Sequence, residues 1–170
     1  MKKHFLNICL LFAFSISYSQ NETTFLQKDK SEFKVSFADH FETLKIKNTK
    51  TKQVQIIKNL EASITGKQSN LEVNDFNFDG FTDFASFHTD DGMGVYTIYE
   101  IFIFNPKTKQ FERLNFPAGF SPKCDMFCDV KIDKIKKTLT SNCRGGARNH
   151  TDVWKYNKNK KLILSKTQSY

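Results

Sequence analysis

The chain has 170 residues, of which 39% are hydrophobic and 26% charged, and its formal net charge is +8. This length suits one domain with a sizeable core. The lysines are scattered over many turns, and no nucleic-acid-binding motif accompanies them, so the charge does not indicate a nucleic-acid partner. We interpret the charge as a solvated basic surface.

The N-terminus has the pattern of an export signal. A basic start, Met1 to His4, precedes an apolar run from Phe5 to Ile16, which is too short to span a bilayer. The small-x-small tripeptide that follows predicts a signal peptide at 1–19, with cleavage before Gln20. We expect the mature chain, 20–170, to be a single domain without a transmembrane segment, periplasmic or secreted.

Beyond the signal, hydrophobic residues alternate with polar ones. Three segments show this period of two, at 33–37, 44–46 and 54–56, and the alternation predicts half-buried strands. The run Tyr96 to Phe104 is dense in β-branched and aromatic residues, as expected of a central strand. No long helix is evident. We therefore predict an all-β antiparallel domain, either a sandwich or a small propeller-like fold.

The segment Asp75 to Asp83 has the ligand spacing of a calcium loop. Oxygen-bearing side chains occupy loop positions 1, 3, 5 and 9, and glycine at position 6 permits a sharp turn. Position 7 of such loops contributes a backbone carbonyl. The predicted ligands of Ca²⁺ are Asp75, Asn77, Asp79, Phe81 and Asp83.

The flanks of this loop differ from those of an EF-hand. Position 12, where an EF-hand requires a bidentate glutamate, is Ser86, and both flanks alternate or carry aromatic residues as strands do. We expect a structural calcium ion in a loop that joins two strands. The alternative is a turn held by Asx hydrogen bonds without a metal.

Three cysteines remain after signal cleavage, in a compartment where disulfides persist. A hairpin centred between Ile135 and Lys136 places opposite each other residues whose numbers sum to 271. Cys128 and Cys143 satisfy this sum, so we expect a Cys128–Cys143 disulfide with Cys124 free. A local Cys124–Cys128 link is the alternative.

The sequence carries no recognisable catalytic motif. The mature histidines are His40, His88 and His150, but no nucleophile elbow, zinc-protease helix or phosphate loop accompanies them. We expect a binding protein and not an enzyme. A hydrolase that uses His88 or His150 is the less favoured alternative.

The order of these features resembles that of exported calcium-loop proteins. The features that match are, in chain order, the signal peptide, the calcium motif at 73–83, a glycine-rich loop leading to tyrosines at 92–99, the Asn-Pro-Lys-Thr-Lys turn at 105–109, Arg-Gly-Gly at 144–146 and the aromatic strand at 154–156. That family includes immunity proteins against lysozyme-like effectors delivered by type IV secretion. Its plan is also similar to that of invertebrate-type lysozyme inhibitors, and the resemblance covers roughly residues 40–166.

The resemblance implies an inhibitor that inserts a loop into the cleft of a lysozyme-like, peptidoglycan-degrading enzyme. The loop would be 88–96, where Gly92 and Gly94 allow close backbone approach and Tyr96 makes the contact. The alternative for 92–96 is an ordinary hairpin turn that leads into a core strand. Arg144 is either a cation for an acidic partner or a surface residue that satisfies nearby carbonyls. Calcium would rigidify the root of the loop. The alternative function is a calcium-dependent envelope adhesion or carbohydrate-binding module.

Overall fold

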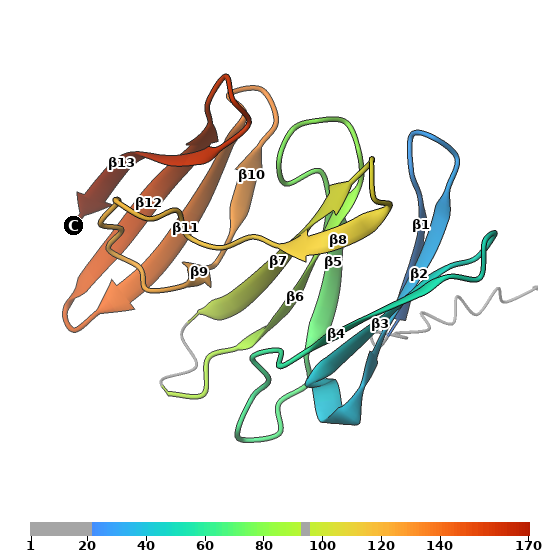
Figure 1. The fold of residues 1–170 in the computed structure, drawn as a ribbon. Helices are drawn as coiled ribbons and strands as arrows, with labels where there is room; N and C mark the ends of the chain where they lie inside the picture. Colours follow the sequence, from blue (N-terminus) through green and yellow to red (C-terminus); the bar gives the residue numbers. More distant parts are fainter. Residues whose placement is uncertain (1–21, 93–95) are drawn as a thin grey trace, which may run out of the picture.

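The computed structural model describes residues 22–92 and 96–170 (Figure 1). The predicted signal peptide, 1–19, lies outside the described residues. The only helical element among them is the short 3-10 turn η1 (Asp39–Phe41). The strands are β1 (Glu22–Leu26), β2 (Glu32–Ala38), β3 (Thr43–Asn48), β4 (Val54–Lys58), β5 (Asn70–Asn74), β6 (Asp83–Thr89), β7 (Thr97–Asn105), β8 (Gln110–Arg113), β9 (Phe127–Cys128), β10 (Lys131–Asp133), β11 (Thr138–Gly145), β12 (Arg148–Tyr156) and β13 (Leu162–Ser169).

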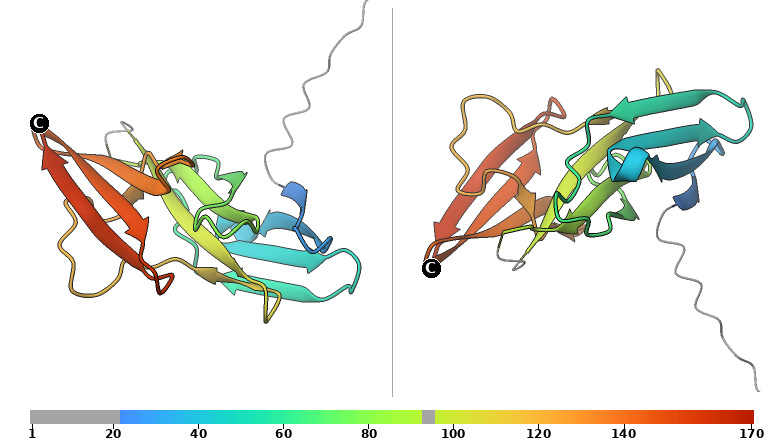
Figure 2. Two further views of the ribbon diagram at one scale, coloured as in Figure 1. Left: turned by 90° about the horizontal axis from the view of Figure 1, so that it is seen from above. Right: turned by 90° about the horizontal axis from the view of Figure 1, so that it is seen from below.

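The all-β prediction is confirmed, and the strands form three antiparallel sheets. Sheet A contains β1 to β4, sheet B contains β5 to β8, and sheet C contains β10 to β13; β9 joins sheet B beside β7. The four main strands of each sheet form a meander in which neighbours in sequence are neighbours in space, and β9 is the exception. Figure 2 shows the three sheets following one another across the molecule in chain order. Within the described ranges, no helix has the length and apolarity needed to cross a membrane.

Sheet B lies between the other two sheets and buries both of its faces. Phe84 and Phe102 pack in a core shared with sheet A. Their neighbours Ala85 and Ile101 pack in a second core, which includes Trp154 of sheet C. Because successive residues of a strand point to opposite faces, β6 and β7 serve both cores. This explains why the segment predicted as a central strand is almost continuously hydrophobic.

Two glutamine side chains join sheet A to sheet B. Gln55 in β4 donates from Nε2 to the carbonyl of Phe111 at 2.7 Å, and its Oε1 accepts from the N–H of the same residue at 2.9 Å. Gln27, just after β1, forms the same pair of bonds with Thr82, at 2.6 and 2.7 Å. Each amide thus satisfies both backbone groups of one residue, which fixes the two sheets relative to each other.

Replacing Gln55 with leucine is expected to lower the free energy of unfolding by roughly 1 to 3 kcal/mol, because the N–H and C=O of Phe111 lose their partners. Urea denaturation of the variant and the wild type measures this difference. The control is Gln53→Leu, an exposed position in the preceding turn, where we expect a change within about 0.5 kcal/mol. Equal effects at the two positions would contradict the role assigned to Gln55.

Candidate functional site

The predicted calcium loop joins two strands, as expected. β5 ends at Asn74 and β6 begins at Asp83, so the loop spans 75–82. Gly80 has a φ of 84°, a left-handed conformation that glycine adopts without a steric penalty. The glycine at position 6 therefore makes the sharp turn for which it was predicted.

Side-chain oxygens of the loop hold its own backbone. Asp75 accepts hydrogen bonds from the N–H groups of Asp79, at 3.1 Å, and Gly80, at 2.9 Å. The Oδ1 of Asn77 accepts from the N–H of Asp79 at 3.0 Å, and the Asp79 carboxylate accepts from the N–H of Phe81 at 2.9 Å. Each of these oxygens has more than one lone pair, so the set retains the hard-oxygen chemistry that Ca²⁺ favours.

Asp83 ties the loop to the central sheet. Its carboxylate is fully buried and accepts from the N–H groups of Phe76 at 2.9 Å, Asn77 at 3.3 Å and Phe104 at 2.8 Å. Burial raises the pKa of this carboxyl to about 7, and the nearby loop carboxylates add to the rise. The backbone bonds therefore position Asp83, while its negative charge is only partly compensated.

No group of three or more His, Cys, Asp or Glu side chains in the described part of the chain is arranged to hold a metal ion. The carboxylates of Asp75, Asp79 and Asp83 accept hydrogen bonds from different backbone N–H groups. The assignment of Asp75, Asn77, Asp79, Phe81 and Asp83 as calcium ligands stays a prediction.

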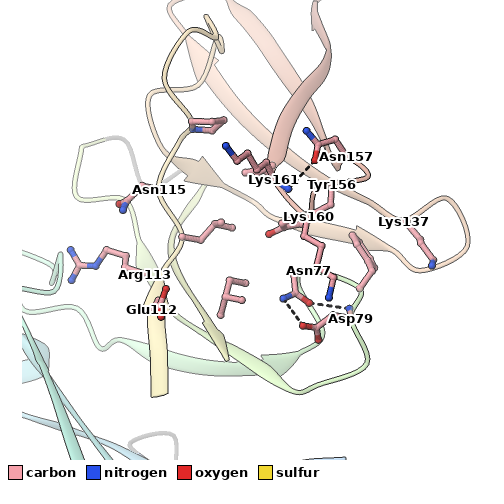
Figure 3. Close-up of a pocket in the computed structure, with 15 residues that line it drawn as sticks. Asn77, Asp79, Glu112, Arg113, Asn115, Lys137, Tyr156, Asn157, Lys160 and Lys161 are labelled. Atoms are coloured by element: carbon pink, nitrogen blue, oxygen red, sulfur yellow. Dashed lines mark hydrogen bonds between the residues drawn. The ribbon is translucent and has the colours of Figure 1, made fainter. Parts of the chain in front are cut away.

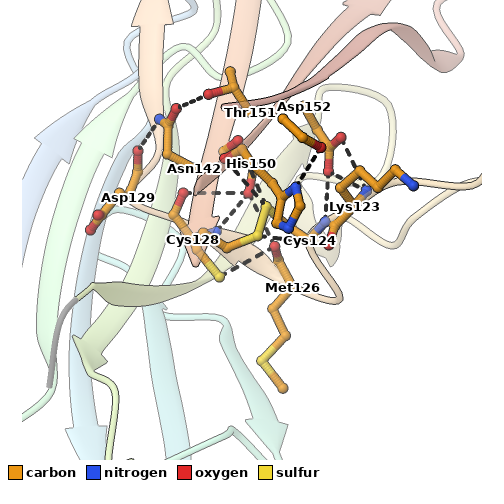
Figure 4. The surroundings of a disulfide bond; sticks show 12 residues. Lys123, Cys124, Met126, Cys128, Asp129, Asn142, His150, Thr151 and Asp152 are labelled. Carbon is orange, nitrogen blue, oxygen red and sulfur yellow. Dashed lines mark hydrogen bonds between the residues drawn. A yellow bond between two sulfur atoms is a disulfide. The ribbon is translucent and has the colours of Figure 1, made fainter. Parts of the chain in front are cut away.

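A disulfide marks a second region, at the edge of sheet C (Figure 4). It joins Cys124, in the segment between β8 and β9, to Cys143 in β11, with the two Cα atoms 5.7 Å apart. The N–H groups of Lys123 and Cys124 donate to the buried carboxylate of Asp152 at 2.9 and 2.8 Å. A covalent bond and a buried carboxylate thus hold this irregular segment against sheet C.

The predicted Cys128–Cys143 disulfide is wrong, although the hairpin register from which it followed is right. Lys131 faces Thr140 as predicted. However, β10 begins only at Lys131, and Asp129 has a left-handed φ of 40°. The chain therefore turns out of the hairpin before it reaches Cys128.

Cys128 belongs instead to β9 and faces Ile98 of β7 in sheet B. It is a buried free thiol, and burial raises its pKa to about 12. Cys124, which was predicted to be free, forms the disulfide with Cys143. Cys128 is therefore held as a neutral thiol of low reactivity.

Two pockets, of about 330 and 400 Å³, open beside the disulfide. Tyr96, Cys143, Arg144 and His150 line both of them, and we call this combined space the disulfide cleft. Tyr96 comes from the segment between β6 and β7, whereas Arg144 comes from β11. The structure therefore brings together two of the residues predicted to contact a partner.

The disulfide cleft presents hydrogen-bond donors among charges of both signs. Burial raises the pKa of Tyr96, and nearby carboxylates such as Asp90 add to the rise, so its hydroxyl stays protonated and can donate. Arg144 is exposed, and its Nε donates to the carbonyl of Gly146 at 3.2 Å. The other charged residues that line the cleft are Glu61, Asp90, Lys123, Asp125, Asp129 and Lys131.

The predicted contact loop is anchored by a residue that the sequence analysis did not identify. Asp91 accepts hydrogen bonds from the hydroxyls of Ser63, at 2.6 Å, and Thr65, at 2.5 Å, and these bonds lower its pKa to about 2. Gly92 is exposed beside Asp90, whose carboxylate would lie 3.3 Å from a Cβ added to the glycine. Gly94 lies outside the described residues.

The histidines give little support to the hydrolase alternative. His88 is buried in β6. The Nδ1 of His150 and the Oγ of Ser169 are 2.7 Å apart, but no described carboxylate forms a hydrogen bond with this imidazole, as a Ser-His-Asp arrangement requires. The absence of enzymatic activity stays a prediction.

Comparison of the chain with protein families, curated proteins and solved structures finds no match. The resemblance to exported calcium-loop proteins therefore still depends on the sequence motifs alone.

Peptide mapping of the non-reduced protein is expected to recover Cys124 linked to Cys143. Cys128 should react with iodoacetamide only after denaturation, because it is buried and its pKa is raised. The Cys128→Ala variant should keep the linked peptide and Cys143→Ala should lose it. A peptide that links Cys128 to either partner in the wild type would contradict the structure.

Proposed function

We propose that the protein is an exported, calcium-stabilised binding protein that inhibits a lysozyme-like peptidoglycan hydrolase, as an inhibitor or immunity protein. The main observation in support of this proposal is that Tyr96 and Arg144 line the same space, the disulfide cleft. A glycoside hydrolase of this kind works with a pair of carboxyl groups. The Tyr96 hydroxyl and the Arg144 guanidinium are donors suited to such groups, and charge-assisted bonds to carboxylates are among the strongest hydrogen bonds.

The disulfide supports the export part of the proposal. Disulfides persist in the periplasm and outside the cell, whereas cytosolic thiols are kept reduced. The Cys124–Cys143 bond links the segment before β9 to β11, and Cys143 also lines the cleft. An oxidising compartment is therefore needed to keep the proposed contact surface in shape.

The calcium part of the proposal is supported by the chemistry of the loop. Its donors are oxygens at the spacing that Ca²⁺ requires, and the buried Asp83 has a raised pKa beside two further carboxylates. A divalent cation would supply the missing positive charge. Because the loop at 75–82 and the segment before Tyr96 lie at opposite ends of β6, calcium would influence the contact loop only through the sheet.

An inhibition assay tests the function. The mature protein, residues 20–170, is titrated in calcium against a panel of purified lysozyme-like muramidases, with one-to-one inhibition of at least one of them expected. Tyr96→Ala and Arg144→Ala should each weaken inhibition by about tenfold or more, as residues central to an interface do, without a change in melting temperature.

The matched control is Lys45→Ala, which removes a positive charge from an exposed position of sheet A and should leave inhibition unchanged. If the protein inhibits no muramidase but is retained on envelope glycan, the adhesion or carbohydrate-binding function is preferred to the inhibitor function. If the Tyr96 and Arg144 variants inhibit as well as wild type, the contact surface is wrong even though the function stands.

Calcium is expected to raise the melting temperature of the wild type and not that of Asp79→Ala, because a ligand that binds only the folded state stabilises it by mass action. Free calcium at 100 times its Kd adds about 2.7 kcal/mol, which corresponds to a rise of roughly 5 to 10 °C for a domain of this size. Glu42→Ala, at an exposed acidic position away from the loop, should respond like the wild type. A wild-type melting curve that is the same in calcium and in EGTA would falsify the calcium site.

A further inference from the structure

A pocket of about 580 Å³ lies between sheets B and C, next to the predicted calcium loop (Figure 3). Its lining comes from the loop, from the ends of β7 and β8, and from the turns that join β10 to β11 and β12 to β13. It shares no lining residue with the disulfide cleft. We call it the loop pocket, and the proposed inhibitor function does not use it.

The interior of the loop pocket is apolar and partly aromatic. Ile103, Leu114 and Leu162 line it, together with the rings of Phe78 and Tyr156. These two rings meet edge to face, with their centroids 6.4 Å apart and their planes at 76°. Pockets of this kind, apolar inside with a few polar groups, are typical small-molecule sites.

Charged side chains surround this apolar interior. Lys137, Lys160 and Lys161 line the pocket, and none of them forms an ion pair with a described residue. By contrast, Arg113 in the same lining already pairs with Glu100, which lies outside it, at 3.0 Å. Two carboxylates, Asp79 and Glu112, also line the pocket, and they accept hydrogen bonds from Phe81 and Asn105 respectively. The three lysines therefore outnumber these carboxylates and leave the lining with a small excess of positive charge.

Three amide side chains, Asn77, Asn115 and Asn157, also line the pocket. Figure 3 shows Asn115 on one side of the space and Asn77 on the other. The side chain of Asn115 has no hydrogen-bond partner among the described residues, whereas Asn77 binds Asp79 within the calcium loop at 3.1 Å. The hydroxyl of Tyr156 is buried and also has no partner in that part of the chain. These groups can donate to, or accept from, the hydroxyls of a bound molecule.

We infer that the loop pocket binds a short anionic saccharide. Its apolar floor and aromatic rings match the carbon faces of sugar rings, the amides match their hydroxyls, and the lysines match a carboxylate on the sugar. The pocket is open to solvent along its basic side, where Lys160 and Lys161 are exposed, so a chain of sugars can extend beyond it. Because the disulfide cleft is separate, a protein held on an anionic glycan would keep that cleft free for a partner.

Isothermal titration with trigalacturonate tests this inference, and neutral galactotriose serves as the uncharged probe. We expect one-to-one binding of trigalacturonate that is at least about tenfold tighter than that of galactotriose. The variant is Lys160→Asn/Lys161→Ala, in which asparagine tolerates the left-handed φ of 58° at position 160. It should weaken the binding of trigalacturonate by about tenfold or more.

The matched control is Lys155→Ala/Lys166→Ala, which removes the same charge from exposed positions of sheet C outside the pocket. It should bind trigalacturonate like the wild type, and both double variants should melt at the wild-type temperature. Equal losses of affinity in the two double variants would show that trigalacturonate is attracted by the overall positive charge and not bound in the loop pocket. Equal affinity of the wild type for the two sugars would contradict the proposal that the ligand is anionic. Inhibition of a muramidase is measured separately, so the failure of either proposal leaves the other intact.

Discussion

The fold depends on burying both faces of sheet B. Large rings, Phe84 and Phe102, fill the face toward sheet A, whereas the smaller Ala85 and Ile101 on the opposite face leave room for Trp154 of sheet C. A sheet that is hydrophobic on both faces needs a cover on each side, so sheets A and C are required for it to be stable in water. The two pockets follow from this stack, because β7 borders the disulfide cleft near its beginning and the loop pocket near its end.

Two buried aspartates accept hydrogen bonds from the backbone of the loops, as neighbouring strands do within the sheets. Asp83 accepts hydrogen bonds from three backbone N–H groups and holds the loop at 75–82, which is the predicted calcium site. Asp152 accepts from the N–H groups of Lys123 and Cys124 and holds the segment before β9. A backbone N–H that is buried outside a helix or sheet still requires a partner, and a carboxylate offers several lone pairs for the purpose. At Asp83 these short-range bonds compensate the burial of charge only in part, because burial still raises its pKa to about 7.

Local pattern predicts the strands well and the tertiary pairing poorly. Alternation located β2, β3 and β4, and the hairpin sum gave the register of β10 with β11. The disulfide prediction failed because one left-handed residue, Asp129, sends Cys128 to a different sheet, and a backbone conformation of this kind has no reliable signal in the side chain. The sequence predicts Tyr96 and Arg144 separately as contact residues. That they line the same cleft depends on how sheets B and C stack, and a local hydrophobic pattern does not predict the stacking of sheets.

The position of the predicted calcium loop determines which pocket a bound calcium ion would affect. The sequence resemblance implies that the ion supports the contact loop at 88–96, but the structure places His88 and Thr89 of that loop in β6. The loop at 75–82 and the segment before Tyr96 therefore lie at opposite ends of β6, a span of roughly 20 Å in extended backbone. Asn77 and Asp79, in contrast, line the loop pocket directly. Asp83 also binds the N–H of Phe104 at the far end of β7. An ion at this loop would therefore act first on the shape of the loop pocket, and would reach the disulfide cleft only through the strands of sheet B.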